Sequence, residues 1–300
     1  MPKPQEHNPP IMESEEPESN PDVNALFSSF RLDQPSYRTF GRHRSPKAPQ
    51  QVERAVADSR YQEPVRVGIF SPMGGSGKST LAASLGSILW QHDKRVLLVD
   101  AAPWPSLAFH YGATTTSPGI RSFFAPEGND VPVRILEQDP NNPKISAIDD
   151  CLSTDPADYI LFDLSGISGP ELVARLDECQ ALVIPLVPDS AAVRYAEAVT
   201  ALLSTLRDPP RRILYVVNQM DESVLAKTVC ARLNETLGHQ LFKKPIYRQM
   251  EIQESLAEGV VLPFFAPESQ AAVVCGEIAQ WLETPQPAAP TKSKKRWAER

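Results

Sequence analysis

The sequence predicts an α/β protein with a doubly wound, mainly parallel sheet flanked by helices, formed by the middle of a 300-residue chain. Three observations lead to this prediction. From Val65 onward, short apolar runs alternate with longer segments of helical periodicity, a pattern typical of repeated βαβ units. A glycine-rich turn joins the first apolar run to the first helical segment. Proline is more frequent toward both ends of the chain than in its middle, so we expect a folded part of about 220 residues.

The two ends of the chain are predicted to lie outside this core. Residues 1–21 combine prolines with the acidic run ESEEPES and bury too little apolar surface to fold, which predicts a disordered tail. Residues 22–64 are predicted to be a docking segment, a short amphipathic helix plus a basic linker, that packs on the chain's own core or on a partner. The apolar residues of that helix are Val23, Leu26, Phe27 and Phe30. Residues 285–300 are predicted to be a disordered basic tail.

Within residues 65–284, each apolar run is predicted to be one strand of the sheet. The predicted strands are residues 65–70, 95–100, 159–163, 181–186 and 212–218. Helical sequence follows the runs. The segment 80–93 is predicted as the first helix and 270–282 as the last.

Composition and charge exclude several classes of protein. With 30 basic and 37 acidic residues the formal net charge is −7, which argues against a protein that coats nucleic acid non-specifically. The four cysteines lack paired spacing, so we expect neither a zinc site nor a disulfide framework, and a reducing cytoplasm fits. No apolar run approaches the length of a transmembrane helix, and the N-terminus has no secretion signal. We therefore expect a cytoplasmic protein that reaches a membrane only through partners or a weak peripheral contact.

The sequence SPMGGSGKST, residues 71–80, lies between the first predicted strand and the first predicted helix. Its GK[ST] core, in this position, is typical of a phosphate-binding P-loop. The glycines let backbone N–H groups close around phosphate oxygens, where a Cβ would clash. Lys78 would bring its charge to the β and γ phosphates, and Ser79 would offer a hydroxyl to Mg²⁺. The predicted nucleotide-binding residues of the loop are Gly74, Gly75, Ser76, Gly77, Lys78, Ser79 and Thr80.

A P-loop NTPase also needs an aspartate on a neighbouring strand, which holds the metal through water. Asp163 ends the run YILFD and precedes the small-residue turn LSGISG, so it has the expected position. We therefore predict Ser79 and Asp163 as the metal residues, with Mg²⁺ as the metal.

Several segments, taken in order, resemble the ParA/MinD superfamily of dimerising P-loop ATPases, whose loop is of the deviant Walker A type. They are MGGSGKST, RVLLVDAAP, YILFD, VVNQMD and IQESLAEGVVLPFFAPESQAA. The resemblance implies that residues 65–284 form an ATPase domain that binds ATP and Mg²⁺ and pairs with a second copy across the nucleotide. It also places Asp100 near the metal as a catalytic residue beside Lys78, and Asn218 at the adenine edge.

Two positions depart from the pattern of that family. Its loop usually begins with a second lysine that reaches the partner's nucleotide, and here Met73 stands in that place. Its second strand typically ends DxDP, in which the second aspartate orients the attacking water, and here that residue is Ala102. A methyl group cannot accept a hydrogen bond, so we expect tight nucleotide binding with hydrolysis slowed by about 10²–10⁴-fold or lost.

These departures and the C-terminal half of the chain resemble a subgroup, the BcsQ (YhjQ) accessory ATPases encoded with bacterial cellulose synthase. Residues 21–40 also resemble short regulatory proteins of cellulose operons. The resemblance implies an ATP-dependent homodimer that assists cellulose biosynthesis and secretion. Its partners would be the cellulose synthase complex or its regulatory subunits, at the cytoplasmic face of the inner membrane or at the cell pole.

Other functions and another base are open on the sequence. A ParA/MinD-type ATPase could serve DNA partitioning, or positioning at the division site or cell pole, and a scaffold could hold ATP as a structural ligand. The basic residues available for a DNA-binding face are Arg207, Arg211, Arg212, Lys243, Lys244 and Arg248, although strong nucleic-acid binding is not expected at this net charge. NQMD is one substitution from the guanine-reading motif NKxD, with Asp221 as the guanine contact and Gln219 in place of the lysine. We predict ATP, because the remaining pattern is ParA-like.

Overall fold

The computed structural model describes residues 63–125, 131–139 and 146–284. These residues all belong to one unit, Asp58–Arg300. The predicted acidic tail at 1–21, the docking helix of the segment 22–64 and the basic tail at 285–300 lie outside the described residues.

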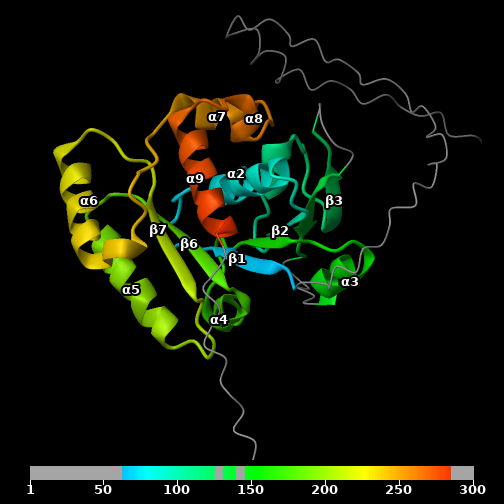
Figure 1. The fold of residues 1–300 in the computed structure, drawn as a ribbon, viewed down its shortest axis with the longest axis horizontal. Helices are drawn as coiled ribbons and strands as arrows, with labels where there is room; N and C mark the ends of the chain where they lie inside the picture. Colours follow the sequence, from blue (N-terminus) through cyan, green and yellow to red (C-terminus); the bar gives the residue numbers. More distant parts are fainter. Residues whose placement is uncertain (1–62, 126–130, 140–145, 285–300) are drawn as a thin grey trace, which may run out of the picture. The chain divides into compact units, whose positions relative to one another are not determined.

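A seven-stranded sheet forms the centre of this unit, in the strand order β3-β4-β2-β5-β1-β6-β7 (Figure 1). The strands are β1 (Val65–Ile69), β2 (Val96–Asp100), β3 (Gly119–Phe123), β4 (Val133–Glu137), β5 (Tyr159–Asp163), β6 (Ala181–Leu186) and β7 (Arg212–Val217). All neighbouring pairs are parallel except β3 with β4. The carboxyl ends of the parallel strands therefore meet at one edge, with β1 between β5 and β6.

Helices cover both faces of the sheet. They are α2 (Lys78–Gln91), α3 (Ser146–Thr154), α4 (Gly169–Glu178), α5 (Ala192–Ser204), α6 (Val224–Leu237), α7 (Met250–Ala257), α8 (Leu262–Phe265) and α9 (Gln270–Glu283), with 3₁₀ turns η1 (Leu107–Tyr111) and η2 (Gly238–Gln240). Figure 1 shows α2, α7, α8 and α9 on one side of the sheet, and α4 and α5 on the other. No helix in the described part of the chain is both long and apolar enough to cross a membrane.

The alternation of side chains along the strands divides the core into two layers. In β2, Val96 and Leu98 belong to the layer that includes apolar residues of α2 and α9, whereas Leu97 and Val99 belong to the layer that includes those of α4, α5 and α6. All four side chains are fully buried. A sheet covered on both faces explains why runs such as RVLLVD and ALVIPL have no alternation of polar residues.

The predicted fold class is confirmed, and the five predicted strands coincide with β1, β2, β5, β6 and β7 to within one residue at each end. The first helix begins at Lys78, two residues earlier than predicted. Lys78 and Ser79 therefore lie in its first turn, where backbone N–H groups are free of intrahelical partners.

Sequence analysis missed β3, β4 and α3. The strand β4 escaped notice because Arg134 and Glu137 are charged, yet they are only 5% and 2% exposed. Arg134 donates to the backbone oxygens of Asp155 and Pro156, and Glu137 forms an ion pair with Arg121. Buried charges of this kind need specific partners, which a hydropathy pattern does not reveal.

Candidate functional site

The loop between β1 and α2 turns tightly at the carboxyl edge of the sheet. Gly75 has a φ of 66° and Gly77 a φ of 88°, left-handed values that glycine adopts without strain. A Cβ on Gly77 would also collide with the side-chain nitrogen of Asn218. Because α2 begins at the next residue, the loop lies at a helix N-terminus, where backbone N–H groups and the helix dipole favour an anion.

Lys78 is held inside this loop. Its side chain is largely buried, and Nζ donates to the carbonyl oxygen of Met73 at 2.9 Å and to Ser76 Oγ at 3.5 Å. Burial lowers the pKa of Lys78, and the charge of Asp163 opposes that shift. Within the described part of the chain, the ammonium group thus has only neutral hydrogen-bond acceptors, for which an anionic oxygen would be a stronger replacement.

Two aspartates lie side by side at the ends of β2 and β5. Asp100 and Asp163 are paired in register, and Asp163 is also opposite Ile69, the last residue of β1. Both carboxylates point to the α2 side of the sheet, because side chains two residues apart share a face and Leu98 and Leu161 lie in the core on that side. Both residues are fully buried.

The carboxylate of Asp163 is only half satisfied. Its Oδ1 accepts hydrogen bonds from the backbone N and the Oγ of Ser165, at 3.1 and 2.5 Å. Its Oδ2 is buried and has no hydrogen-bond partner among the described residues. Burial raises the pKa of Asp163, and the hydroxyls of Ser165 and Ser79 oppose the shift. A buried oxygen without a donor is costly, and a bound cation or water would satisfy it.

The oxygen of Ser79 lies next to this carboxylate. Ser79 Oγ is 3.4 Å from Ser165 Oγ, which itself donates to Asp163. A hydroxyl and a carboxylate are oxygen ligands of the kind that Mg²⁺ takes, together with phosphates and water. Within the described ranges, no group of three or more His, Cys, Asp or Glu side chains could hold a metal. A metal at Ser79 and Asp163 would therefore need ligands from a bound molecule.

Asp100 fixes the loop that follows β2. Its Oδ2 accepts from the backbone N of Ser106 and of Leu107, each at 2.7 Å, and its Oδ1 accepts from that of Ala102 at 3.2 Å. Burial raises the pKa of Asp100 to about 6, and the three N–H donors limit the shift. Ser106 Oγ in turn donates to Ser79 Oγ at 3.4 Å. Asp100 thus reaches the P-loop through Ser106, and its predicted catalytic role near the metal stays a prediction.

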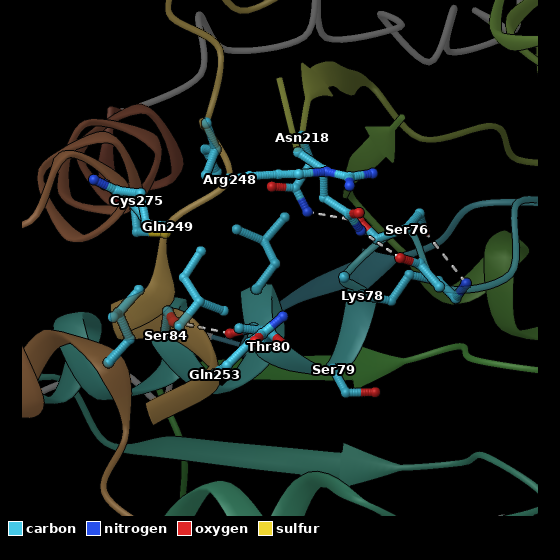
Figure 2. A pocket seen from close by; sticks show the side chains of 18 of the residues that line it. Ser76, Lys78, Ser79, Thr80, Ser84, Asn218, Arg248, Gln249, Gln253 and Cys275 are labelled. Carbon is cyan, nitrogen blue, oxygen red and sulfur yellow. Dashed lines mark hydrogen bonds between the residues drawn. The ribbon is translucent and has the colours of Figure 1, made fainter. Parts of the chain in front are cut away.

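A cavity of about 720 Å³ opens at the P-loop and extends over α2 toward α7 and α9. In Figure 2, Ser76 and Lys78 lie at one end of it and Gln249 and Cys275 at the other. The predicted nucleotide-binding residues that line it are Gly74, Gly75, Ser76, Gly77, Lys78, Ser79, Thr80 and Asn218. Asp100 and Asp163 are not part of the lining. A cavity of this size is large enough for a small organic ligand.

The far wall of the cavity was missed by sequence analysis. It comes from residues 246–253 and from α9, including Arg248, Gln249 and Gln253. Gln249 Oε1 accepts from the backbone N of Ala271, which ties the wall to the start of α9. This segment carries no chemical motif, and only its folding back against the end of β7 makes it part of the site.

The family model of the CobQ/CobB/MinD/ParA nucleotide binding domain matches residues 67–262. The chain belongs to this family. Similar proteins include the chromosome-partitioning ATPase Soj of Thermus thermophilus, 26% identical over 243 residues, which are 72% of this chain and 94% of that protein. A ParA family ATPase from Chlorobium tepidum TLS has a TM-score of 0.62 at 22% identity, covering 73% of this chain and 99% of the other. MinD from Pyrococcus horikoshii OT3, complexed with Mg-ADP, has a TM-score of 0.54 at 17% identity, covering 74% and 96%.

The predicted resemblance to ParA/MinD proteins is thus confirmed, and the two departures from the ParA/MinD pattern can be located. Met73 and Ala102 are both buried, 6% and 5% exposed. The side chain of Met73 belongs to the core layer that includes Leu172 of α4, and its carbonyl oxygen accepts from Lys78 Nζ. Ala102 donates its backbone N–H to Asp100. Neither side chain offers a polar group to the cavity.

Proposed function

We propose that this ParA/MinD-type protein binds ATP with Mg²⁺ at the P-loop and that the bound nucleotide drives its pairing with a second copy. The observation that carries the proposal is the buried Oδ2 of Asp163, which lacks a donor among the described residues and lies beside the P-loop serine Ser79. A Mg²⁺ ion bound by Ser79 and, through water, by Asp163 would satisfy this oxygen and neutralise phosphate charge. The Mg-ADP complex of the MinD relative supports this assignment.

The loop would bind and orient the phosphates. Backbone N–H groups between Gly74 and Thr80 would face the phosphate oxygens, since Gly75 and Gly77 allow the turn that this requires. Lys78 Nζ, which now donates to neutral oxygens, would form a charge-assisted bond to a phosphate. The burial of Lys78 strengthens that bond, because water competes less.

The base is proposed to be adenine. Asn218 Nδ2 donates to the carbonyl oxygen of Ser76 at 2.7 Å, which fixes the orientation of the side-chain amide. Its Oδ1, which accepts no hydrogen bond from the described residues, is then an acceptor for a base. Adenine presents an exocyclic amino donor where guanine presents a carbonyl oxygen. Asp221, the alternative guanine contact, accepts from the backbone N of Ser223 and is not part of the cavity lining.

Hydrolysis is proposed to be slow. Lys78 would stabilise charge on the phosphates, but the position expected to orient the attacking water holds the buried methyl group of Ala102. Losing such a group costs about 10²–10⁴-fold in rate. The protein would therefore remain in its nucleotide-bound state for long periods.

Pairing across the nucleotide face is supported by the loop between β2 and η1. Trp104 in this loop is 89% exposed, although tryptophan is an anchor residue of many interfaces. Its loop reaches the P-loop through Ser106, whose hydroxyl donates to Ser79. A second copy that covered Trp104 would therefore lie at the edge of the sheet where the nucleotide site opens.

Two cellular roles are candidates for this switch. The similarity to Soj, a chromosome-partitioning ATPase, favours a ParA/MinD-type role in DNA partitioning or in positioning at the division site or cell pole. A role in cellulose biosynthesis and secretion, with the cellulose synthase complex as partner, has no support from the relatives described above. DNA binding is expected to be weak, because Arg212 stacks on Trp281 and Lys244 pairs with Glu277, which removes two of the six basic candidates from a DNA-binding face. Gel shifts with plasmid DNA at physiological salt test this expectation directly.

Calorimetry with Mg-ATP and Mg-GTP tests the proposed nucleotide. We expect saturable binding of Mg-ATP, weaker binding of Mg-GTP, and loss of both in Lys78→Ala. Size exclusion should show a larger species with ATP than with ADP. Tight binding by Lys78→Ala would contradict the proposal that Lys78 binds the phosphates. Stronger binding of GTP than of ATP would contradict adenine as the base. The same elution volume with ATP and with ADP would contradict pairing driven by ATP.

A further inference from the structure

The end of β7 is tied to the P-loop by two consecutive side chains. Asn218 Nδ2 donates to the carbonyl oxygen of Ser76 at 2.7 Å, and Gln219 Nε2 donates to that of Gly75 at 2.5 Å. Figure 2 shows Asn218 next to Ser76 on the same side of the cavity. Two successive peptide groups of the loop are thus held from one strand end.

The backbone of Gln219 is unusual. Its φ is 58°, in the left-handed region that few residues other than glycine, asparagine and aspartate adopt. A glutamine there costs backbone energy that a glycine would avoid, and it supplies a side-chain amide that a glycine lacks. Among the residues that the structure describes, the one hydrogen bond of that amide is to the carbonyl oxygen of Gly75.

These two bonds determine where the N–H groups of the loop point. In a trans peptide the carbonyl oxygen of one residue and the N–H of the next point in opposite directions. With the oxygens of Gly75 and Ser76 held toward β7, the N–H groups of Ser76 and Gly77 are directed away from it. Neither N–H donates to an acceptor within the described residues, so both are available to a ligand.

The same strand end also holds the far wall of the cavity. Met220 donates its N–H to the oxygen of Ile246 at 2.9 Å and accepts from the N of Arg248 at 3.0 Å. Residues 218–220 therefore connect the phosphate loop to the wall that carries Arg248 and Gln249. A shift of this segment would move both ends of the ligand site together.

We propose that Gln219 is a positioning residue of the P-loop, whose hydrogen bond to Gly75 aims the N–H groups of Ser76 and Gly77 at the phosphates of a bound nucleotide. The inference rests on the proposed function, since it needs a nucleotide at the loop. Gln219 itself does not touch the phosphates in this account. Its effect is to keep the loop in the binding conformation before the ligand arrives.

Three substitutions at one position test the proposal by calorimetry with Mg-ATP and by thermal unfolding of the ligand-free protein. Gln219→Glu keeps the shape but places a carboxylate oxygen opposite the carbonyl of Gly75, and we expect at least a tenfold higher Kd. Gln219→Lys retains a donor and should bind within about threefold of the wild type. Gln219→Gly relieves the left-handed backbone, so its Tm should be unchanged or higher, while its Kd rises severalfold. Gln91→Glu, at the opposite end of α2, adds the same charge on an exposed side chain and serves as the matched control.

Weaker binding at an unchanged or higher Tm in Gln219→Gly distinguishes positioning from a purely structural role, in which Tm and affinity would fall together. Wild-type affinity in Gln219→Glu and Gln219→Gly would overturn the inference and leave the proposed function intact. Failure of the wild type to bind Mg-ATP would overturn both.

Discussion

Replacing Asp163 by asparagine should stabilise the ligand-free protein while it weakens nucleotide binding. The carboxylate is fully buried, its Oδ2 has no donor among the described residues, and burial raises its pKa, so the folded state disfavours the charge at neutral pH. An unsatisfied buried polar atom costs about 1–3 kcal/mol. In Asp163→Asn, Oδ1 can still accept from Ser165, and the amide nitrogen could donate to the hydroxyl oxygen of Ser79, which interacts with the carboxylate of Asp163. We therefore expect the free energy of unfolding to rise by about 1–3 kcal/mol at pH 7.5.

Urea unfolding in EDTA, without nucleotide, measures this change. A gain of this size in a domain of some 220 residues raises Tm by several degrees, about 2–4 °C per kcal/mol. Mg-ATP binding by the same variant should weaken at least tenfold, because the neutral amide attracts a hydrated cation less. Asp208→Asn, an exposed carboxylate, is the control and should leave stability within about 0.5 kcal/mol. A loss of stability in Asp163→Asn, or an unchanged affinity for Mg-ATP, would refute the claim that Oδ2 of Asp163 is unsatisfied in the ligand-free protein and binds the hydrated metal ion.

Three further predictions concern other parts of the site and the core. Burial lowers the pKa of His110 to about 4 from its ordinary 6.5, so the unfolded state takes up a proton first as the pH falls, and the folded protein loses about 3 kcal/mol of stability between pH 6.5 and 4. Asp100, whose pKa is raised to about 6, has the opposite effect: its contribution to the free energy of unfolding decreases as the pH rises. In His110→Gln the effect of Asp100 remains, so the free energy of unfolding should fall as the pH rises from 4 to 6. A rise, measured by urea titration, would contradict the buried, neutral state of His110 in the folded protein. Ala102→Asp should increase the rate of phosphate release from ATP by at least tenfold. An unchanged rate would contradict the claim that the missing carboxylate at position 102 limits hydrolysis. Mg-ATP should shift tryptophan emission to shorter wavelength in the wild type but far less in Trp104→Phe, and equal shifts would exclude Trp104 from the contact with a second copy.

The centre of the fold could be predicted from the sequence because its strands are buried on both faces. Runs such as YILFD and ALVIPL, each followed by helical sequence, favour a covered parallel sheet, and the glycine-rich turn indicates which edge carries the site. The same rule placed Asp163 beside the P-loop, since the ends of neighbouring parallel strands meet at one edge. At the P-loop and at Asp163, the residue pattern and the order of the strands therefore lead to the same prediction.

The remaining parts depend on contacts distant in the sequence. The strand β4 is hidden by Arg134 and Glu137, whose charges are satisfied only by residues from other elements. The wall at residues 246–253 joins the site because it folds back onto β7 through Met220. The contribution of Gln219 follows from a backbone angle and one hydrogen bond, neither of which a residue pattern contains. Its neighbour Asn218 was predicted to read the base, and its bond to Ser76 adds a second role to that prediction.

A crystal structure with Mn²⁺ and a non-hydrolysable ATP analogue tests the central claim most directly, since the anomalous signal of manganese locates the metal. The account predicts the triphosphate inside the turn of Gly75 and Gly77, with the ion bound to Ser79 Oγ and linked by water to Asp163 Oδ2. A metal peak remote from these two oxygens, or a triphosphate outside that turn, would contradict it.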